Sequence, residues 1–311
     1  MFLENLRNIV RKKILFFFEP ITYINFFSKE DKFKFFTKKL RNIYYESLAK
    51  HDLVPIKQVR KVFKINNLYA DLFIDTHDFS NIGQVIDPEW EENLFEYYKK
   101  IDLDKIFFID LGGNIGCHSL FFLKYMKFDK ISYVEPNKKC FELFNKSLSI
   151  QNSSKIENVL PINKAIAEKN GTSSLKFFKN NSGSGSTVNY FGKKSKSSIM
   201  HQMESQFNLV QIQNITITEL LNDATDDNKI IIKMDIQGYE PKILLQLSDL
   251  INKYNITHCF FEVNQKDENV MLEAIKKFGK DYSLKDLNDN FIDLENIGQY
   301  MKQVVLLEKK I

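Results

Sequence analysis

From residue 105 onward, short apolar runs alternate with stretches that have the spacing of amphipathic helices. The runs are IFFID, ISYVE, NVLPIN, IIIKMD and THCFFE, followed by YSLKDL and QVVLLEK near the end of the chain. The helical stretches are expected at 115–126, 137–149, 241–251 and 267–278. Strands that alternate with helices form right-handed crossovers and a parallel sheet covered on both faces. The pattern predicts a doubly wound α/β fold with a mostly parallel seven-stranded sheet, whose last two runs form an antiparallel pair.

Two further segments, TSSLKFF and VQIQNITI, are expected to be strands outside this alternation. Between them lies KNNSGSGSTVNYFGKKSKSS, residues 179–198, which is rich in Gly, Ser and Asn and poor in residues that build a core. A long polar loop inside a compact domain is usually functional or disordered. We therefore expect residues 179–198 to form a loop that contributes to specificity.

Residues 1–55 form a basic region of helical character. Apolar residues recur at three- and four-residue steps on both sides of Pro20, which predicts two amphipathic helices. Residues 1–50 contain eleven Lys and Arg against five Asp and Glu, although the net charge of the whole chain is +4. Packing on the main domain, or on a second copy of it in a homo-oligomer, is favoured over contact with a membrane surface or a partner. The main domain is then expected at 56–311, with its core at 105–311.

The lead-in to this core, residues 59–100, is predicted to contain a hairpin and a helix. VRKVFKI and LYADLFID are typical of strands, and Asn66-Asn67 is a favourable turn pair between them. Pro88 is expected to open the helix PEWEENLFEYYKKI, because its acids fall in the first turn and its lysines in the last, as the helix dipole prefers.

Composition and cysteine usage limit the class of protein. With 43% hydrophobic and 27% charged residues, and no stretch of about 20 apolar residues, the chain is expected to be a soluble globular protein. The early apolar run Ile14–Phe18 is shorter than the core of a signal peptide. Cys117, Cys140 and Cys259 have no metal-ligand spacing, so buried reduced thiols are expected. These features favour a cytoplasmic location, with peripheral contact at the inner membrane face through residues 1–50 as an open alternative.

The segment IFFIDLGGNIG is predicted to turn a buried strand into a helix. Gly112, Gly113 and Gly116 let the backbone approach a ligand closely, and Asn114 tolerates a positive φ. The free N–H groups of the new helix could hold an anion such as the carboxylate of a cofactor. Asp110 ends the strand and could pair with a cationic amino group, directly or through water.

Polar residues follow the predicted strands at the edge where ligands bind in open α/β sheets. They are Asp110, Glu135, Asn163, Asp235 and Glu262. Glu135 could accept hydrogen bonds from both ribose hydroxyls of an adenosine cofactor. Its alternative role is that of an acid favoured by the start of the next helix, where Pro136 follows it. Asn163 and Ala165 complete the expected cofactor residues.

The spacing of the glycines argues against a nicotinamide dinucleotide. The dinucleotide fingerprint is G-x-G-x-x-G directly after the strand, whereas this chain has G-G-N-I-G and lacks the glycine at the third position. An acid directly before the turn would also repel a pyrophosphate. The pattern favours a cofactor that presents an amine and a carboxylate, as S-adenosylmethionine does.

Several motifs, in order along the chain, resemble the FkbM family of class I methyltransferases. They are DLGGNIGCHSL, YVEPNKKCFELF, NKAIAEKNG, ITITELL, IIKMDIQGYEPKIL and CFFEVN, and they extend from about residue 85 to residue 265. The resemblance implies a Rossmann-like fold, S-adenosylmethionine as the methyl donor, and O-methylation of hydroxyl groups on sugars, glycans or other small metabolites. The family commonly has Asp-x-Glu-Gly-x-Glu after the fourth strand, where this chain has Gln237 in place of the middle carboxylate. The first fifty residues lie outside the resemblance.

A hydroxyl acceptor needs a base to remove its proton, and three residues are candidates for this catalytic role. Asp235 is the first choice because it ends the strand expected beside the first one; a structural role in the IQGYE turn is equally open. Glu240 could instead cap a helix, and His118 could simply be a packed histidine. No metal site is predicted, although Asp235, Glu240 and Glu262 together could bind Mg²⁺.

The sequence is therefore interpreted as that of an S-adenosylmethionine-dependent methyltransferase acting on a small-molecule or glycan hydroxyl. The loop at 179–198 and the N-terminal helices are the expected specificity elements. Two alternatives stay open: an RNA methyltransferase that uses the basic N-terminal region as its phosphate footprint, and a non-catalytic protein that binds the cofactor or docks to a membrane. A nucleic-acid partner is not favoured, because no recognition motif occurs and basic residues alternate with Phe and Tyr.

Overall fold

The computed structural model describes residues 62–66, 71–75, 78, 80–81, 84, 90–178, 181–187, 207–263 and 268–310. The elements below belong to the larger of two compact units, which comprises Gln58–Val85 and Glu91–Ile311. The predicted helical region at 1–55 lies outside the described residues. Within the described part of the chain, no helix has the length and apolar composition of a membrane span.

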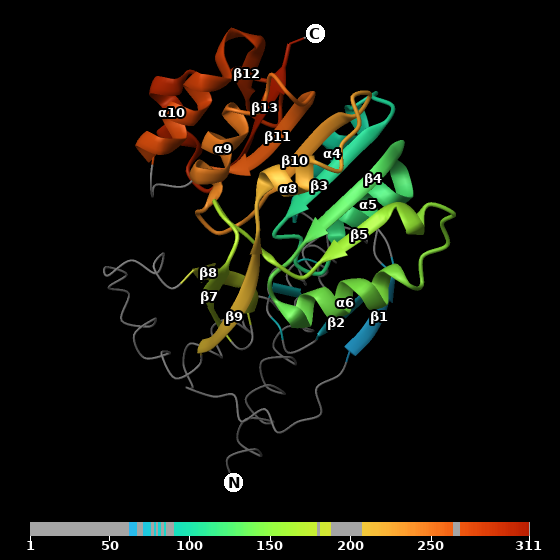
Figure 1. The fold of residues 1–311 in the computed structure, drawn as a ribbon. Helices are drawn as coiled ribbons and strands as arrows, with labels where there is room; N and C mark the ends of the chain where they lie inside the picture. The colour runs from blue at the N-terminus through green and yellow to red at the C-terminus, as the bar shows by residue number, and fades with distance from the viewer. Residues whose placement is uncertain are drawn as a thin grey trace, which may run out of the picture. The chain divides into compact units, whose positions relative to one another are not determined.

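The centre of this unit is a seven-stranded sheet in the order β12-β13-β11-β10-β3-β4-β5 (Figure 1). The strands are β3 (Ile106–Leu111), β4 (Phe128–Val134), β5 (Val159–Ile162), β10 (Lys229–Met234), β11 (Ile256–Glu262), β12 (Tyr282–Lys285) and β13 (Val304–Lys309). The five strands from β5 to β11 are parallel, and β13 runs antiparallel to both of its neighbours. The predicted doubly wound, mostly parallel seven-stranded sheet is confirmed, including its antiparallel final pair.

Helices cover both faces of this sheet. They are α4 (Glu92–Lys100), α5 (Cys117–Tyr125), α6 (Lys138–Leu148), α8 (Ile217–Leu221), α9 (Glu240–Ser248) and α10 (Glu268–Phe278), with 3₁₀ turns η1 (Ile156–Asn158), η4 (Gly279–Asp281) and η5 (Leu294–Tyr300). On β3, Phe107 and Ile109 belong to a core cluster shared with α8, α9 and α10. Phe108 points to the opposite face, where its ring stacks on Phe122 of α5 with centroids 3.7 Å apart. Because both faces are covered, all of β3 is buried, and every residue of the strand except Asp110 is apolar.

A second, four-stranded sheet has the order β6-β9-β7-β8. Its strands are β6 (Ala165–Ile166), β7 (Thr172–Phe178), β8 (Asn181–Thr187) and β9 (Phe207–Ile215). The predicted strands TSSLKFF and VQIQNITI correspond to β7 and β9, which pair antiparallel. The prediction of one long loop at 179–198 is wrong in its first part, since residues 181–187 form β8 and pair with β7. The strand consists of Asn, Ser, Gly and Thr and lacks the alternation of apolar and polar residues by which strands are recognised in a sequence.

The predicted hairpin is present as β1 (Val62–Asn66) and β2 (Asp71–Asp75), which pair antiparallel. Asn66 is the last residue of β1 and pairs with Asp71, so the connection is 67–70 and not a turn at Asn66-Asn67. The hairpin is attached to α6, because the backbone N–H of Phe73 donates to Ser147 Oγ at 2.8 Å.

The helix of the lead-in begins at Glu92, four residues after the predicted start at Pro88. Glu91 has a φ of 49°, in the left-handed region, so the backbone at this residue does not continue a right-handed helix. The predicted charge distribution is nevertheless present, with Glu92 in the first turn and Lys99 and Lys100 in the last.

Candidate active site

The glycine turn connects β3 to α5 and lies against the neighbouring strands β4 and β10. Gly112 and Gly113 donate their backbone N–H groups to Val134 O at 2.9 and 3.1 Å. Gly112 has a φ of +75°, and a Cβ on it would overlap the backbone oxygen of Asp235. Gly116, with a φ of +87°, leaves no room for a Cβ beside the ring of Phe144. The sequence needs glycine at both positions because the conformation and the close packing each exclude a side chain.

Asn114 occupies the tip of this turn with a φ of 49°. Its backbone N–H donates to Glu135 Oε2 at 2.9 Å, and its side-chain Nδ2 donates to Ser80 Oγ at 2.7 Å. The buried hydroxyl of Tyr133 donates to the backbone oxygen of Asn114. These three contacts fix the tip of the glycine turn to the end of β4 and to the segment after β2.

Glu135 follows β4 and is buried, with 6% of its surface exposed. Its two carboxylate oxygens accept the backbone N–H groups of Asn114 and Asn137, at 2.9 and 2.7 Å. Burial raises the pKa of Glu135 to about 7, against the opposing effect of these two hydrogen bonds. Asn163 supports the same strand end, since its Nδ2 donates to Glu135 O at 2.8 Å and to Pro136 O at 3.2 Å.

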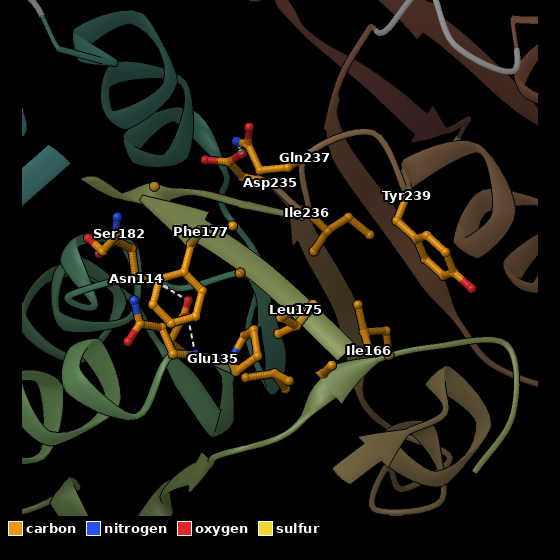
Figure 2. A pocket seen from close by; sticks show the side chains of 17 residues that line it. Asn114, Glu135, Ile166, Leu175, Phe177, Ser182, Asp235, Ile236, Gln237 and Tyr239 are labelled. Carbon is orange, nitrogen blue, oxygen red and sulfur yellow. Dashed lines mark hydrogen bonds between the residues drawn. The ribbon is translucent and has the colours of Figure 1, made fainter. Parts of the chain in front are cut away.

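A pocket lies at the carboxyl ends of β3, β4 and β10, with about 790 Å³ of empty space when the adjoining open solvent is included. Figure 2 shows Asn114, Glu135 and Phe177 gathered on one side of it and Asp235 and Gln237 on another. The lining residues are Gly112, Asn114, Val134, Glu135, Pro136, Asn137, Ala165, Ile166, Leu175, Phe177, Ser182, Gly183, Gly185, Asp235, Ile236, Gln237 and Tyr239.

The residues predicted for cofactor binding divide into two groups. Gly112, Asn114, Glu135 and Ala165 line the pocket. The others are outside the lining and support it from behind: Asp110, Gly113, Gly116 and Asn163. Their roles in binding stay predictions.

Asp110 is completely buried behind the glycine turn. Ser119 Oγ donates to its Oδ2 at 2.7 Å, and the ammonium of Lys233 lies 3.7 Å from its Oδ1. The cation beside Asp110 is therefore a lysine of the protein, where the sequence suggested the amino group of a ligand.

Asp235 borders the pocket directly after β10, with 38% of its side chain exposed. Gln237, which replaces the family's usual carboxylate, donates through Nε2 to Asp235 Oδ1 at 2.8 Å. Lys233 Nζ lies 3.9 Å from Asp235 Oδ2. Burial disfavours the charged form of Lys233, but Asp110 and Asp235 together raise its pKa above the usual lysine value. Asp235 thus has a partner on each oxygen and still faces the pocket.

Glu240 is at the start of α9, fully buried and outside the pocket lining. Its Oε1 accepts the backbone N–H of Ile236 at 2.8 Å. Burial raises the pKa of Glu240 to about 8. The contact with Ile236 supports the turn that carries Asp235, so Glu240 helps to position Asp235. Its predicted catalytic role stays a prediction.

His118 is buried in the first turn of α5 and is likewise outside the pocket lining. Its Nε2 lies 2.6 Å from Glu91 Oε2, and its ring stacks on Phe95 with centroids 4.8 Å apart. Burial opposes ionisation of Glu91, but the proximity of His118 lowers the pKa of Glu91 below its usual value. This environment is that of a packed histidine paired with a carboxylate, and its catalytic role stays a prediction.

Glu262 ends β11, and burial together with Asp235 raises its pKa. Within the described residues, no three His, Cys, Asp or Glu side chains are grouped so that they could hold a metal ion. The alternative of a magnesium site at Asp235, Glu240 and Glu262 therefore receives no support from the geometry.

The second sheet supplies one wall of the pocket; the sequence analysis missed the part from β7 and expected the part from β8 as a loop. Leu175 and Phe177 come from β7, and Ser182, Gly183 and Gly185 come from β8. The one signal in the sequence was the spacing of Gly183 and Gly185, two residues apart and hence on one face of a strand. Because no strand was predicted for this segment, the spacing could not be used to place the two glycines on one face.

A comparison with protein families decides the family of this chain. The model described as the methyltransferase FkbM domain matches residues 110–284, which is more than half of the sequence. The chain belongs to the FkbM methyltransferase family. The match includes the glycine turn, Glu135 and Asp235, and it confirms the resemblance on which the sequence analysis relied. S-adenosylmethionine, the cofactor predicted from the sequence, is confirmed with this membership.

Among curated proteins, no sequence matches the chain. Among solved structures, the chain is similar to the methyltransferase FkbM from Methylobacillus flagellatus KT, at 14% identity and a TM-score of 0.43, covering 74% of this chain and 53% of that one. It therefore spans about half the length of that protein.

Two shorter structures are also similar. A putative methyltransferase from Streptococcus mutans in complex with SAH has 14% identity and a TM-score of 0.39, covering 70% of this chain and 97% of that one. An rRNA methylase from Streptococcus thermophilus has 11% identity and a TM-score of 0.37, covering 70% and 95%. Similarity at this level carries no argument about the acceptor.

Proposed function

We propose that this FkbM family member transfers the methyl group of S-adenosylmethionine to a hydroxyl group of a sugar, a glycan or another small metabolite. The observation that carries the proposal is the half-exposed carboxylate of Asp235, which borders the same pocket as the glycine turn and Glu135. A potential base and a potential nucleoside site therefore share one cavity.

The pocket residues fit an adenosine-containing cofactor. A carboxylate offers about four acceptor positions, and the two backbone N–H groups on Glu135 leave others for ribose hydroxyls. Val134, Ile166 and Leu175 supply apolar surface for a flat ring. Gly112 lets the backbone border the pocket without a side chain. When bound, the cofactor would supply an electrophilic methyl group on a sulfonium.

Asp235 is the residue best arranged to accept the proton of a hydroxyl acceptor. Methyl transfer is an in-line displacement, so alignment contributes most of the rate, and a positioned base adds roughly 10² to 10⁴. The amide of Gln237 holds one oxygen of Asp235 at 2.8 Å, and the ammonium of Lys233 lies near the other. These two contacts restrict the orientation of the carboxylate. The fit to a hydroxyl acceptor also rests on the family resemblance.

The acceptor class is tested by comparing glycans and small metabolites from cells with and without the gene. We expect mass spectrometry to find one species that is about 14 mass units lighter in the cells without the gene, because it lacks one methyl group. Complementation with the wild-type chain should restore this species, and complementation with Asp235→Asn should not. Loss of methylation confined to RNA would contradict the proposal and support the nucleic-acid alternative.

A further inference from the structure

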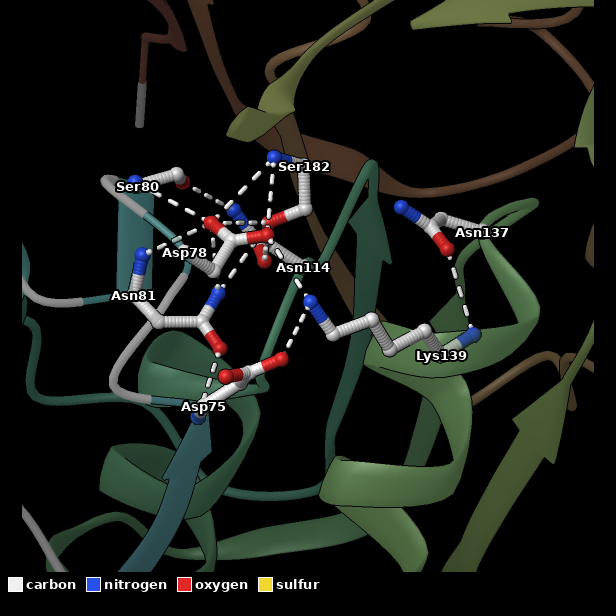
Figure 3. Close-up of polar contacts among 8 residues, drawn as sticks. All are labelled: Asp75, Asp78, Ser80, Asn81, Asn114, Asn137, Lys139 and Ser182. Atoms are coloured by element: carbon white, nitrogen blue, oxygen red, sulfur yellow. Dashed lines mark hydrogen bonds and ion pairs between the residues drawn. The ribbon is translucent and has the colours of Figure 1, made fainter. Parts of the chain in front are cut away.

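A buried polar cluster connects the segment after β2 with the pocket, and the proposed chemistry does not use it. At its centre is Asp78, which is 1% exposed (Figure 3). Both carboxylate oxygens accept hydrogen bonds. The donors are Ser80 N at 3.1 Å, Asn81 N and Nδ2 at 3.3 Å, Ser182 N at 3.2 and 3.1 Å, Ser182 Oγ at 3.0 Å and Lys139 Nζ at 3.3 Å. A buried carboxylate surrounded by donors on every side is a rigid anchor.

Two of these contacts fasten β8 to the cluster. The backbone N–H and the hydroxyl of Ser182 both point to Asp78, more than a hundred residues away in the sequence. Ser182 Oγ also accepts from Asn81 Nδ2 at 3.0 Å. Ser182 and Gly183 line the pocket, so the anchored part of β8 is part of its wall.

The same cluster holds the side chain of Asn114 from two sides. Its Nδ2 donates to Ser80 Oγ at 2.7 Å, and Ser80 in turn donates its backbone N–H to Asp78. Its Oδ1 lies 3.3 Å from Ser182 Oγ, which shares its single proton between Asn114 and Asp78. The tip of the glycine turn is thereby tied to β8 directly through Ser182 and indirectly through Ser80 and Asp78.

Gly183 permits this close approach. A Cβ on Gly183 would lie 2.6 Å from Ser80 Oγ and 3.6 Å from Asn114 Nδ2. With a larger residue at this position, either β8 or the side chain of Ser80 would have to move, and Ser80 carries the link to Asn114.

Helix α6 supplies one positive charge to the two carboxylates of the cluster, from Lys139. Lys139 Nζ lies 2.5 Å from Asp75 Oδ2 and 3.3 Å from Asp78 Oδ2. Two buried carboxylates share this ammonium, and 27% of the Lys139 side chain is exposed. An amide in place of the Asp78 carboxylate would turn an NH₂ group toward other donors, whichever way it is oriented.

We propose that Asp78 is a positioning residue for the cofactor, because it holds Ser182 and Gly183 of β8 against the pocket and fixes Asn114 at the tip of the glycine turn. The inference rests on the assignment of this pocket to S-adenosylmethionine. It predicts that the affinity for the cofactor depends on a residue that does not touch it.

The test measures S-adenosylmethionine binding to the full chain by calorimetry. We expect Asp78→Asn to raise the Kd about tenfold or more, because a network around a charged group is broken. Asp223→Asn is the matched control, since Asp223 pairs with Lys130 on the surface, and its Kd should equal that of the wild type. If the wild type itself does not bind, the proposed function fails; if the wild type and a folded Asp78→Asn variant bind equally, only this inference fails.

Two further variants keep the charge of Asp78 and guard against a folding defect. Ser182→Ala removes a hydroxyl from the network, and Gly183→Ala pushes on Ser80; each should weaken binding about threefold or more. The double variant Asp78→Asn with Ser182→Ala should bind no more weakly than Asp78→Asn alone, because both changes release the same strand. A purely structural role would leave the Kd of the folded variants unchanged, and strictly additive effects would also overturn the inference.

Discussion

The single residue Glu135 has two functions in the structure. It accepts hydrogen bonds from two backbone N–H groups, and it borders the pocket. Burial raises its pKa to about 7, so the carboxylate form becomes dominant only as the pH rises through neutrality. The carboxylate form is the one that accepts hydrogen bonds from hydroxyls on both oxygens.

We therefore expect the affinity for S-adenosylmethionine to rise as the pH increases from about 6 to about 8, as calorimetry at a series of pH values would measure. The variant Glu135→Gln should bind more weakly and show a flat profile over this interval. An identical pH dependence in wild type and variant would exclude Glu135 as its origin.

Asp235 carries the proposed proton transfer. Asp235→Asn keeps the size of the side chain and removes the base, so we expect the rate of methyl transfer to fall by about 10² to 10⁴. The Kd for S-adenosylmethionine should change by less than about threefold, because Glu135 and the glycine turn are untouched. A rate within about threefold of wild type would contradict the role of Asp235.

Glu240 offers a prediction about stability. Its pKa is about 8 in the folded chain against 4.5 as the ordinary value, so the folded state binds its proton more tightly than the unfolded state. The free energy of unfolding should then fall as the pH rises from about 4.5 through about 8, and the full cost of ionising a buried carboxyl is present above that interval.

Glu240→Gln resembles the protonated acid and cannot ionise. Between about pH 6 and 9, urea unfolding should therefore show a smaller loss of stability for Glu240→Gln than for the wild type. Parallel profiles would show that Glu240 does not titrate in this interval. Retained methyl transfer in the same variant would remove Glu240 as a candidate base.

The sequence motifs singled out several residues that the structure brings together, although their roles stay predictions. Gly112, Asn114, Glu135 and Asp235 gather around one pocket because parallel strands deliver their carboxyl ends to one edge. The cation beside Asp110 was not predictable, since Lys233 faces it only through the register of β10 against β3. Asp78 was also missed, because its partners are distant in sequence and its segment has no regular pattern.

At the scale of elements, burial determined which predictions succeeded. Strands β3, β10 and β11 are buried on both faces, and their apolar runs identified them in the sequence. Strand β8 is made of small polar residues and is recognised only through its pairing with β7. The start of α4 was misplaced because local helix signals at Pro88 do not reveal the left-handed backbone of Glu91.

The turn between β3 and α5 gives a prediction at this scale. Gly112→Ala would force a Cβ onto the backbone oxygen of Asp235 in a conformation with φ of +75°. We expect the turn to shift, with the Kd for S-adenosylmethionine raised about tenfold or more and a lower melting temperature. Gly298→Ala is the control, since a Cβ there meets nothing within 4 Å, and it should bind as the wild type does. Equal Kd values for the two variants would contradict the role of the turn.

At the scale of the whole unit, the pocket is bordered by both sheets. The seven-stranded sheet supplies the glycine turn, Glu135 and Asp235, and the four-stranded sheet supplies β7 and β8. An in-line displacement needs its reactants held in one orientation, and walls from two sheets provide more constraint than one strand edge alone. Binding of the cofactor should therefore stabilise the unit as a whole.

Calorimetric titration of the purified full chain with S-adenosylmethionine tests this account most directly. We predict saturable binding and, at a cofactor concentration of about 100 times the Kd, a gain of roughly 2.7 kcal/mol in the free energy of unfolding. A nicotinamide dinucleotide in the same experiment should produce neither effect. A folded chain that shows no heat of binding and no change in melting temperature with S-adenosylmethionine would contradict the account.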